Sequence, residues 1–539
     1  MTMLLNLLSP PSIAVLASAA PADLLLDVIR YGLSTLYIIL LLLVATFGFH
    51  RWILVYLYYK HRKNAPRAAA TFSDLPCVTI QLPMYNELYV AQRVIASTCV
   101  IDYPKDKLQI QVLDDSTDET TRIASETVQQ FAARGYNIIY LHRTNRCGFK
   151  AGALDEGLRV ATGQFVAIFD ADFIPRPDIL LNTIHHFTDP AVGMVQVRWD
   201  HLNRQHSLLT RVQAILLDAH FMIEHTARNR SGRFMNFNGT AGLWRRSCIE
   251  DGGGWQHDTL TEDLDLSYRC QMKGWRFVYL PDITSPAELP PEINAFKQQQ
   301  FRWTKGAIQT ARKMLPAILR SPLPLKVKIE AFFHLLNPMS YLFMSILILL
   351  ILPVFYLQFS AFSQSGSVGR HLFDLSLFLL ASCSASTFYL CSQREIFSTW
   401  FDKIKYLPFL MSIGVGMAIN NSRGILEALF GKDSAFERTP KFGIDQQTSR
   451  NDWLKKAPSF ARKKGSIVPF IEIAYGLYMT ACIVLCLIRQ SPLSFSLPFL
   501  VIFAIGYFYV GILSLYSRYL FTAKPAPDAH APIMQSSPA

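Results

Sequence analysis

The stretch QFVAIFDAD, residues Gln164–Asp172, places a short apolar run directly before two aspartates that are separated by one residue. The apolar run predicts a buried β-strand over Gln164–Phe169, so that Asp170 and Asp172 stand at the carboxyl end of this strand. Two carboxylates in this position can face one hard divalent cation, and we expect Mg²⁺ or Mn²⁺. Such an ion would bridge a diphosphate and neutralise it as a leaving group. The alternative is the Asp-x-Asp of an ordinary loop.

The residues before this stretch repeat the same plan of a strand followed by a helix. Short β-rich segments alternate with segments of helical periodicity, which predicts a mostly parallel, doubly wound α/β sheet. The expected strands are Cys77–Leu82, Leu108–Leu113, Asn137–Leu141 and Gln164–Phe169, and the expected helices are Val90–Val100, Asp118–Arg134 and Lys150–Val160. Ligands bind such sheets at the carboxyl ends of the strands. Asp114-Asp115 begins where one of these strands ends, as Asp170 does.

The composition indicates an integral membrane protein. Of the 539 residues, 51% are apolar and only 17% are charged, and the mean hydropathy is positive. Uncharged runs of roughly 18 residues or more are long enough to span a bilayer. These runs are Tyr31–Phe49, Ala331–Gly369, Leu375–Gln393 and Gln490–Ser517, and Ser466–Ile488 qualifies if Glu472 is tolerated. The roughly 250 residues between Thr71 and Pro324 contain no such run, which predicts a soluble domain.

The charge of one basic loop determines the expected topology. The segment Lys432–Lys464 carries nine Lys and Arg against four Asp and Glu, so the positive-inside rule places it in the cytoplasm. The apolar run within Tyr406–Phe430 then lies in the membrane interface, which leaves five spans. We expect the N-terminus outside, and the soluble domain and the C-terminus inside, in a bacterial inner membrane. Glu472, an ionisable group in a span, is either a pore or gate residue or reaches the interface.

This topology divides the chain into five parts. They are an outside or interfacial N-terminal segment (1–30), a first transmembrane helix (31–60), a cytoplasmic domain (71–325), a region of transmembrane and interfacial helices (326–521) that contains the loop 432–464, and a disordered tail (522–539). The first 29 residues contain no Lys or Arg, so the basic start of a signal peptide is not expected.

Charge and cysteine content argue against two other classes of protein. The net charge of +12 is compatible with nucleic-acid binding, but the basic residues crowd next to apolar runs, where cytoplasmic anchoring explains them. We therefore expect membrane lipids, and no nucleic acid, as partners. The nine cysteines show no CxxC pairs and no metal-binding spacing, which indicates reduced or buried thiols and no disulfide framework.

Three motifs near the start of the soluble domain suit a phosphorylated ligand. Asp114-Asp115 can bind a base or ribose, although the segment also fits a plain helix N-terminus. Tyr85 and Glu87, after the first strand, offer an aromatic face and a polar group to a base, or form a simple turn. Lys150 places a cation at a helix start where phosphates can bind, and as a solvated lysine it would be unremarkable.

Two later motifs suit group transfer to a sugar. Inversion needs one carboxylate to take the proton of the acceptor hydroxyl, and Asp263 is our candidate base. Glu262 beside it is alternatively an ordinary acid of a first helical turn. Gln299, Arg302 and Trp303 lie about one helical turn apart. Arg302 can hold a pyrophosphate through two hydrogen bonds and Trp303 can offer its indole face to a sugar, or they are a surface arginine and a core tryptophan.

In this order, the four motifs resemble those of the family-2 glycosyltransferases of the cellulose-synthase and hyaluronan-synthase kind. That signature is an Asp-Asp, an Asp-x-Asp, a Thr-Glu-Asp and a Gln-x-x-Arg-Trp, and the match covers roughly Val78–Lys441. The resemblance implies an α/β, Rossmann-like catalytic domain of the glycosyltransferase-A type. By this resemblance, Asp114 or Asp115 with Tyr85 and Glu87 would hold the nucleotide, and Asp170 and Asp172 the metal. Asp263 would be the base, and Gln299, Arg302 and Trp303 would border the acceptor site. The residue chemistry above adds Lys150 and Arg302 to the nucleotide-sugar site and Glu262 to the catalytic site.

Two loops and one short segment extend the resemblance. Phe237–Gly242 resembles the loop that contacts the acceptor, and its matching positions are Asn238, where cellulose synthases carry Cys, Gly239 and Thr240. Phe436–Lys441 resembles the gating loop Phe-x-Val-Thr-x-Lys of the family. Its matching positions are Phe436, Thr439 and Lys441, and Arg438 replaces Val. Ala287–Pro290 looks most like the mannan and glucan synthases of the cellulose-synthase-like group.

The resemblance thus implies a membrane-embedded, processive, inverting hexosyltransferase. It would take hexose from UDP-glucose or GDP-mannose, extend a β-linked glucan or mannan, and pass the growing polysaccharide outward through its spans. A second reading is a lipid glycosyltransferase, because relatives of ceramide glucosyltransferases share similar motifs; five spans and the gating-like loop favour the polymer. A third is a catalytically inactive transporter or scaffold, which the intact acidic motifs disfavour.

Overall fold

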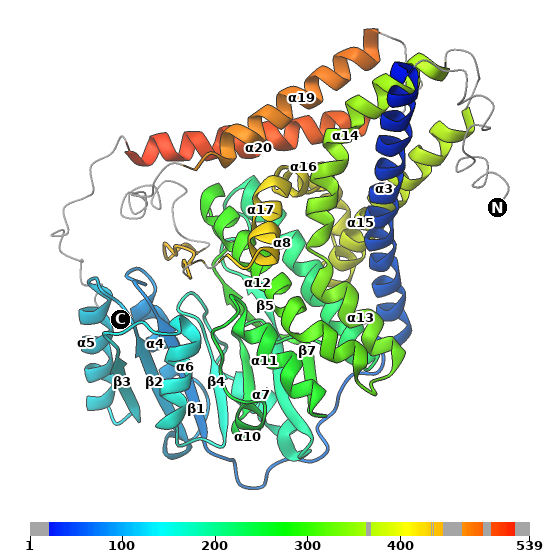
Figure 1. Ribbon diagram of the computed structural model, residues 1–539. Coiled ribbons are helices and arrows are strands. Elements are labelled where there is room, and N and C mark those ends of the chain that lie inside the picture. The colour runs from blue at the N-terminus through cyan, green and yellow to red at the C-terminus, as the bar shows by residue number, and fades with distance from the viewer. Residues whose placement is uncertain are drawn as a thin grey trace.

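The computed structural model of the chain describes residues 21–362, 368–432, 434, 436–445, 466–488 and 497–522. An α/β domain with an open sheet lies on one side, and long apolar helices lie on the other (Figure 1). The segment before residue 21, the tail after residue 522 and residues 433, 435 and 446–464 of the loop 432–464 lie outside the described residues.

One sheet of seven strands forms the centre of the α/β domain, in the order β3-β2-β1-β4-β6-β5-β7. The strands are β1 (Val78–Met84), β2 (Leu108–Asp114), β3 (Ile138–His142), β4 (Phe165–Ile168), β5 (Val192–His201), β6 (Gly242–Arg245) and β7 (Arg276–Ala287). The predicted strands β1 to β4 are all present and pair in parallel. β5 also pairs in parallel with β7, but β6 runs antiparallel to β4 and to β5. The sheet is therefore mixed, and β5, β6 and β7 are additions to the four strands that were predicted.

Helices cover both faces of the predicted half of the sheet. The helices are α4 (Ala91–Cys99), α5 (Thr120–Ala133) and α6 (Phe149–Arg159). Alternate residues of β4 point to opposite faces, so Phe165 and Ala167 join the core under α4 and α5, whereas Val166 and Ile168 join the core under α6. Burial on both faces explains why these strands are continuously apolar in the sequence.

Two helices border the carboxyl ends of the strands. They are α11 (Glu262–Met272) and α12 (Ile293–Arg320), of which α12 runs from the α/β domain toward the apolar helices (Figure 1). The remaining short elements of the described chain are η1 (Lys105–Lys107), α7 (Ile179–Ile184), η2 (His185–Thr188), α8 (Leu208–Ala219), η3 (His220–His225), α9 (Thr226–Arg230), α10 (Arg246–Asp251), α13 (Leu325–Leu336), η4 (Trp400–Tyr406), α16 (Leu407–Gly416) and α17 (Ala418–Leu429).

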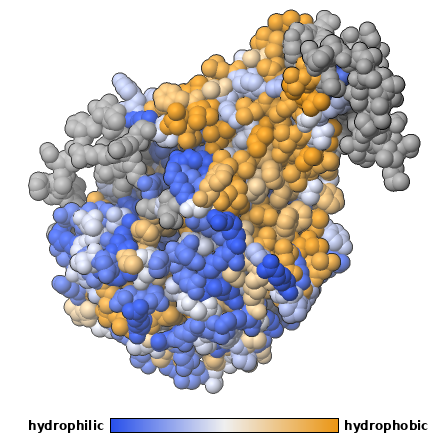
Figure 2. All heavy atoms as spheres, in the orientation of Figure 1, coloured by the Kyte–Doolittle hydropathy of each residue, from blue (hydrophilic) through white to orange (hydrophobic). Residues whose placement is uncertain are grey.

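The apolar part consists of the short helices α16 and α17 and of five long helices. They are α3 (Pro21–His61), α14 (Met339–Phe362), α15 (Val368–Ile396), α19 (Val468–Ile488) and α20 (Leu497–Thr522). Apolar side chains gather over this part of the surface, whereas the α/β domain is largely hydrophilic (Figure 2). Among the described residues, three helices are long and apolar enough to cross a membrane, at Leu25–His61, Val468–Ile488 and Leu497–Tyr519. These helices are consistent with a membrane protein.

Three features of the helices differ from, or add to, the predicted organisation. The expected span Ala331–Gly369 is broken, because α13 and the described part of α14 meet at a bend of 57°. The first long helix begins at Pro21, ten residues before the predicted start of the first span. The apolar run within Tyr406–Phe430 forms two successive short helices, α16 and α17, that pack on α20 and α12 respectively. The number of spans and the sidedness of the chain stay predictions.

Candidate active site

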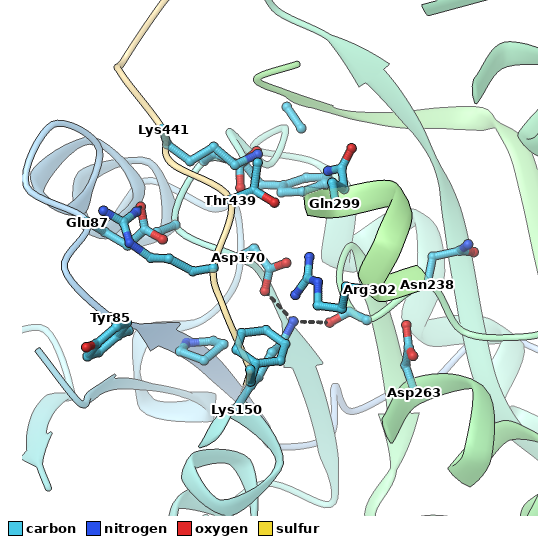
Figure 3. A pocket seen from close by; sticks show the side chains of 18 of the residues that line it. Tyr85, Glu87, Lys150, Asp170, Asn238, Asp263, Gln299, Arg302, Thr439 and Lys441 are labelled. Atoms are coloured by element: carbon cyan, nitrogen blue, oxygen red, sulfur yellow. Dashed lines mark hydrogen bonds and ion pairs between the residues drawn. The ribbon is translucent and has the colours of Figure 1, made fainter. Parts of the chain in front are cut away.

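A cavity opens at the carboxyl ends of β1, β2 and β4, where α11, α12 and the loop 436–441 meet (Figure 3). Most residues that the sequence marks as functional line it. They are Tyr85, Glu87, Asp115, Lys150, Asp170, Asp172, Asn238, Gly239, Glu262, Asp263, Gln299, Arg302, Trp303, Phe436, Thr439 and Lys441. These residues are up to 356 positions apart in the sequence, from Tyr85 to Lys441, and the fold brings them together.

Asp114 and Thr240 are the two marked residues that do not line the cavity. Asp114 is completely buried; its carboxylate accepts hydrogen bonds from the Tyr140 hydroxyl (2.6 Å) and from the Ser116 backbone N–H (3.0 Å). Thr240 is also completely buried, and its hydroxyl accepts a hydrogen bond from the backbone N–H of Asp170 at 2.8 Å. A ligand in the cavity cannot reach these two side chains directly. Each of them instead holds neighbouring residues of the cavity in place through its hydrogen bonds.

Asp115 is held in place by an arginine that the sequence analysis did not mark. The Arg143 guanidinium donates to both carboxylate oxygens of Asp115, from Nε at 2.7 Å and from Nη2 at 2.6 Å. A second unmarked arginine, Arg146, stacks over the Tyr85 ring with 3.3 Å between its Cζ atom and the ring centroid. Flat stacking surfaces and a fixed carboxylate are suited to a base and a ribose.

The two carboxylates at the end of β4 are each paired with a lysine. Lys150 Nζ lies 2.5 Å from Asp170 Oδ1 and also donates to the Gly239 carbonyl at 2.9 Å, as the dashed lines in Figure 3 mark. Lys441 Nζ lies 2.6 Å from Asp172 Oδ2. In the part of the chain that the structure describes, no group of three or more His, Cys, Asp or Glu side chains is arranged for a metal ion. Two carboxylates nevertheless fit Mg²⁺ or Mn²⁺, because these ions take their other ligands from phosphates and water.

Asp263 lies in the first turn of α11 and faces the Asn238-Gly239 loop. The backbone N–H of Leu264 donates to Asp263 Oδ1 at 2.8 Å. Burial and the neighbouring charge of Glu262 together raise the pKa of Asp263 to about 7, against the lowering effects of that N–H and of Lys150. A carboxyl group with a pKa near neutrality can take a proton and release it at physiological pH, as a general base must.

Asn238 offers one free acceptor near Asp263. Its side-chain N–H₂ group donates to His220 Nε2 at 3.0 Å, on the π-helical turn η3, and its Oδ1 atom is buried without a hydrogen-bond partner among the described residues. A buried polar atom without a partner is unfavourable unless a ligand satisfies it. The hydroxyl of a sugar would do so.

α12 presents Gln299, Arg302 and Trp303 to the cavity. Arg302 is surrounded by carboxylates, with Glu262, Asp170 and Asp263 the strongest, and these oppose the lowering of its pKa by burial. The Arg302 Nε atom is buried and has no hydrogen-bond partner among the described residues. Its guanidinium therefore keeps a donor for an anionic ligand.

The loop 436–441 closes over the cavity and is anchored by two glutamates. Arg438 Nη1 donates to Glu87 Oε2 at 2.7 Å. Beyond the loop, the carboxylate of Glu288 accepts the backbone N–H groups of Phe442 (2.8 Å), Gly443 (2.8 Å) and Ile444 (3.1 Å). Phe436 stacks on Phe149 and lies under the Arg302 guanidinium, at 4.5 Å. The replacement of Val by Arg438 thus adds an ion pair to the loop.

Sequence reasoning missed Glu288, Arg143 and Arg146 as site residues. Glu288 stands in a segment that the resemblance singled out, but only the fold reveals that its carboxylate faces residues 154 to 156 positions away. Arg143 and Arg146 lie just before the marked Lys150, and nothing in their spacing distinguishes them from solvated arginines.

The chain is similar in sequence to known proteins. Residues 76–306 match the family model described as glycosyltransferase like family 2. The chain is 44% identical over 254 residues to glucomannan 4-beta-mannosyltransferase 2 of Arabidopsis thaliana, which covers 46% of this chain and 48% of the relative. It is 46% identical over 259 residues to glucomannan 4-beta-mannosyltransferase 1 of Oryza sativa subsp. japonica, covering 46% and 49%. The chain spans about half the length of the curated relatives it matches.

A solved structure is also similar. The mannosyltransferase from Pyrobaculum calidifontis in complex with GDP-Man and Mn²⁺ is 22% identical, and the match covers 76% of this chain and 100% of that chain at a TM-score of 0.47. The mixed sheet with acidic residues at its strand ends and the match to the family model agree with each other. Residues 76–306 therefore form a domain that is similar to the glycosyltransferases of family 2.

Proposed function

We propose that this chain is a membrane-bound, inverting, processive hexosyltransferase that builds a β-linked mannan from a nucleotide-diphosphate sugar. One observation supports this most strongly: Asp170, Asp172, Asp263 and Arg302 line a single cavity. The helix α12, which carries Arg302, also packs against α17 and α20 of the apolar part. A site for sugar transfer thus lies next to helices that are suited to a membrane.

The sheet side of the cavity, which we call the donor side, would bind the nucleotide sugar. Tyr85 with Arg146 stacked on it would contact the base, and Asp115, fixed by Arg143, would accept hydrogen bonds from the ribose. The free donor of Arg302 would bind the diphosphate. Lys150 stands at the start of α6, where the helix dipole also favours phosphate.

Asp170 and Asp172 would hold a divalent ion, Mg²⁺ or Mn²⁺, together with the diphosphate. When bound, the ion would neutralise the charge of the departing nucleoside diphosphate. Lys150 and Lys441 neutralise these carboxylates in the structure, so both ammonium groups have to move toward the phosphates when the site is loaded.

The side formed by α11, α12 and the Asn238-Gly239 loop, which we call the acceptor side, would hold the end of the growing chain. Asp263 would take the proton of the attacking hydroxyl, with Glu262 keeping its pKa high. Asn238 Oδ1 would accept a hydrogen bond from the sugar, and the Trp303 indole would stack on it. Attack on the face of the donor sugar opposite the nucleotide inverts its anomeric configuration.

Closure of the loop 436–441 would exclude water from the cavity, because Phe436 and Thr439 lie over it. The polymer would then leave between the apolar helices and cross the membrane, with the α/β domain in the cytoplasm and the N-terminus outside. The basic character of the segment 432–464 supports this orientation. We expect a bacterial inner membrane.

GDP-mannose is the preferred donor in this proposal and UDP-glucose is second. The two curated relatives described above are named as mannosyltransferases and resemble the chain over 254 and 259 residues. The chemistry of the donor side does not itself distinguish the bases, because stacking and a carboxylate serve both.

The test is to incubate the purified full chain in lipid nanodiscs with radiolabelled GDP-mannose or UDP-glucose and Mg²⁺ or Mn²⁺. The product is then digested with a β-mannanase or a β-glucanase. The proposal predicts a polymer that the mannanase degrades and that is absent in the Asp263→Asn variant. Label only in a solvent-extractable lipid would support a lipid glycosyltransferase instead, and no transfer from any sugar donor would support an inactive scaffold.

A further inference from the structure

A buried ion pair joins the site helix α12 to the apolar helix α19. Lys297 Nζ lies 2.7 Å from Glu472 Oε2, and the two side chains are 7% and 0% exposed. Glu472 stands in the candidate span Val468–Ile488, where a charge without a partner would be strongly unfavourable. The Glu472 side chain is thus buried against Lys297; its role as a pore or gate residue and its place relative to the membrane interface stay predictions.

The same turn of α12 is fixed by further hydrogen bonds as well. Lys297 Nζ also donates to Ser514 Oγ on α20 at 3.2 Å, and its carbonyl oxygen accepts the Asn420 amide of α17 at 2.8 Å. One turn earlier, the Asn294 side-chain amide donates to the Ser514 carbonyl at 3.2 Å. Three helices of the apolar part thus contact the start of α12.

This turn leads directly into the acceptor side of the cavity. Gln299 follows Lys297 by two residues and so projects from nearly the opposite face of the helix, about 200° away. Arg302 and Trp303 follow within the next turn. Gln298, between Lys297 and Gln299, contacts Glu437 of the loop 436–441. A shift of α12 against α19 would therefore move the acceptor side, together with Arg302, and leave the rest of the donor side, which belongs to the sheet, in place.

Stability alone does not account for a pair of this kind. Removal of both charges in favour of apolar side chains of similar volume is often neutral or favourable for stability, whereas removal of one charge leaves the other buried and unpaired. What an apolar pair cannot supply is a directional contact that selects one register between two helices.

We propose that Lys297 and Glu472 are positioning residues that set the register of α12 against the membrane helices and thereby align the end of the acceptor chain with the donor sugar. This inference rests on the proposed function. It assigns to an ion pair in the apolar part an effect on transfer to a sugar acceptor that exceeds its effect, through Arg302, on donor binding and on the attack of water on the donor.

The experiment compares the wild-type chain with Lys297→Met/Glu472→Met, which removes both charges at similar volume. Lys297→Arg keeps the pair, and Lys313→Met is the matched control, because Lys313 on the same helix pairs with Asp258 of the α/β domain at 2.8 Å. For each protein in nanodiscs, we would measure the thermal midpoint, the affinity for GDP, the hydrolysis of GDP-mannose without acceptor, and the mean length of the polymer.

We expect the double variant to fold and to keep GDP affinity and donor hydrolysis within about twofold of the wild type, but to make a polymer about tenfold shorter. Lys297→Arg and Lys313→Met should keep the wild-type length. Wild-type length in the double variant would overturn the inference, as would an equal loss of hydrolysis and length. If the double variant does not fold, Glu472→Gln serves in its place, and the same comparison of length with hydrolysis decides. A wild-type chain without polymer would contradict the proposed function itself, and the inference with it.

Discussion

The donor side and the acceptor side of the cavity are held in different ways. On the donor side, Asp115 is fixed by Arg143, and Asp170 by Lys150, all from the α/β domain. On the acceptor side, α12 is fixed from outside that domain, through Lys305 with Glu427 of α17 at 3.1 Å and through the Lys297–Glu472 pair. In the proposed function, the α/β domain alone shapes the nucleotide-sugar site, whereas alignment of the polymer end depends on the apolar helices.

The largest effect is expected at Asp263, on the acceptor side. Asp263→Asn removes the base and should lower kcat by about 10² to 10⁴-fold, because proton transfer to a positioned carboxylate contributes that much. GDP affinity should stay within about twofold of wild type, since Asp263 is not on the donor side. Single-turnover transfer and GDP titration would measure the two effects. A variant that transfers sugar at a normal rate would remove Asp263 from the mechanism.

A smaller effect is expected from Gly239→Ala, which crowds the same place. Gly239 has φ +81°, which L-residues rarely adopt, and an added Cβ would lie 3.0 Å from Asp263 Oδ2. The Lys150–Gly239 carbonyl contact would shift with the backbone. We expect kcat to fall by about 10²-fold. The matched control is Gly135→Ala, which also has positive φ but has nothing within 4 Å of the added Cβ, and wild-type kcat is expected for it. Similar losses in both variants would mean that backbone strain, and not the contact with Asp263, is responsible.

The pH dependence sharpens the assignment of the base. Burial and the neighbouring charge of Glu262 raise the pKa of Asp263 to about 7, so below pH 7 the carboxyl is increasingly protonated and cannot accept the hydroxyl proton. At saturating donor, kcat should therefore fall about tenfold per pH unit below 7 and level off above it. Saturation matters because burial also raises the pKa of Glu87, on the donor side, to about 7. A kcat that is independent of pH from 5 to 8 would contradict the role of Asp263.

The smallest effect is expected at the anchor of the loop. Glu288→Gln replaces one carboxylate oxygen with an N–H₂ group, so at least one of the three backbone N–H groups loses its acceptor. Amide exchange of residues 442–444 should become about tenfold faster, and the KM for donor should rise by about five-fold, while exchange in β4 stays unchanged. Mass-spectrometric hydrogen exchange would measure this. Unchanged exchange at 442–444 would show that other contacts hold the loop.

The same contrast explains what the sequence could reveal. β1 to β4 and the positions of Asp115, Asp170 and Asp172 follow from local alternation of strand and helix, so they were predicted and are present. Asp114 looked equivalent to Asp115, but adjacent residues at a strand end point to opposite sides, so that only Asp115 lines the cavity and Asp114 accepts a hydrogen bond from Tyr140. β6 is antiparallel because it returns across the sheet between β4 and β5, which local patterns do not encode.

Contacts between distant parts of the chain, at the loop anchor and at α12, could not be predicted for a related reason. Glu288 with residues 442–444 and Lys297 with Glu472 join positions more than 150 residues apart, and each partner taken alone is compatible with several roles. In the sequence alone, Glu472 is compatible with a pore or gate residue and with a side chain that reaches the interface, because its contact with Lys297 is not apparent there. Local composition reports burial and secondary structure, whereas pairing across the α/β domain and the apolar helices depends on the whole fold.

Processivity is the property that most directly tests whether one cavity joins donor transfer to a held polymer end. The purified chain in nanodiscs would be mixed with a large excess of short mannan oligosaccharides and limiting labelled GDP-mannose, and the product lengths would be resolved over time. We predict long labelled polymer from the earliest times while most oligosaccharide remains unextended. A ladder in which all acceptors lengthen together by one or a few sugars would contradict the account.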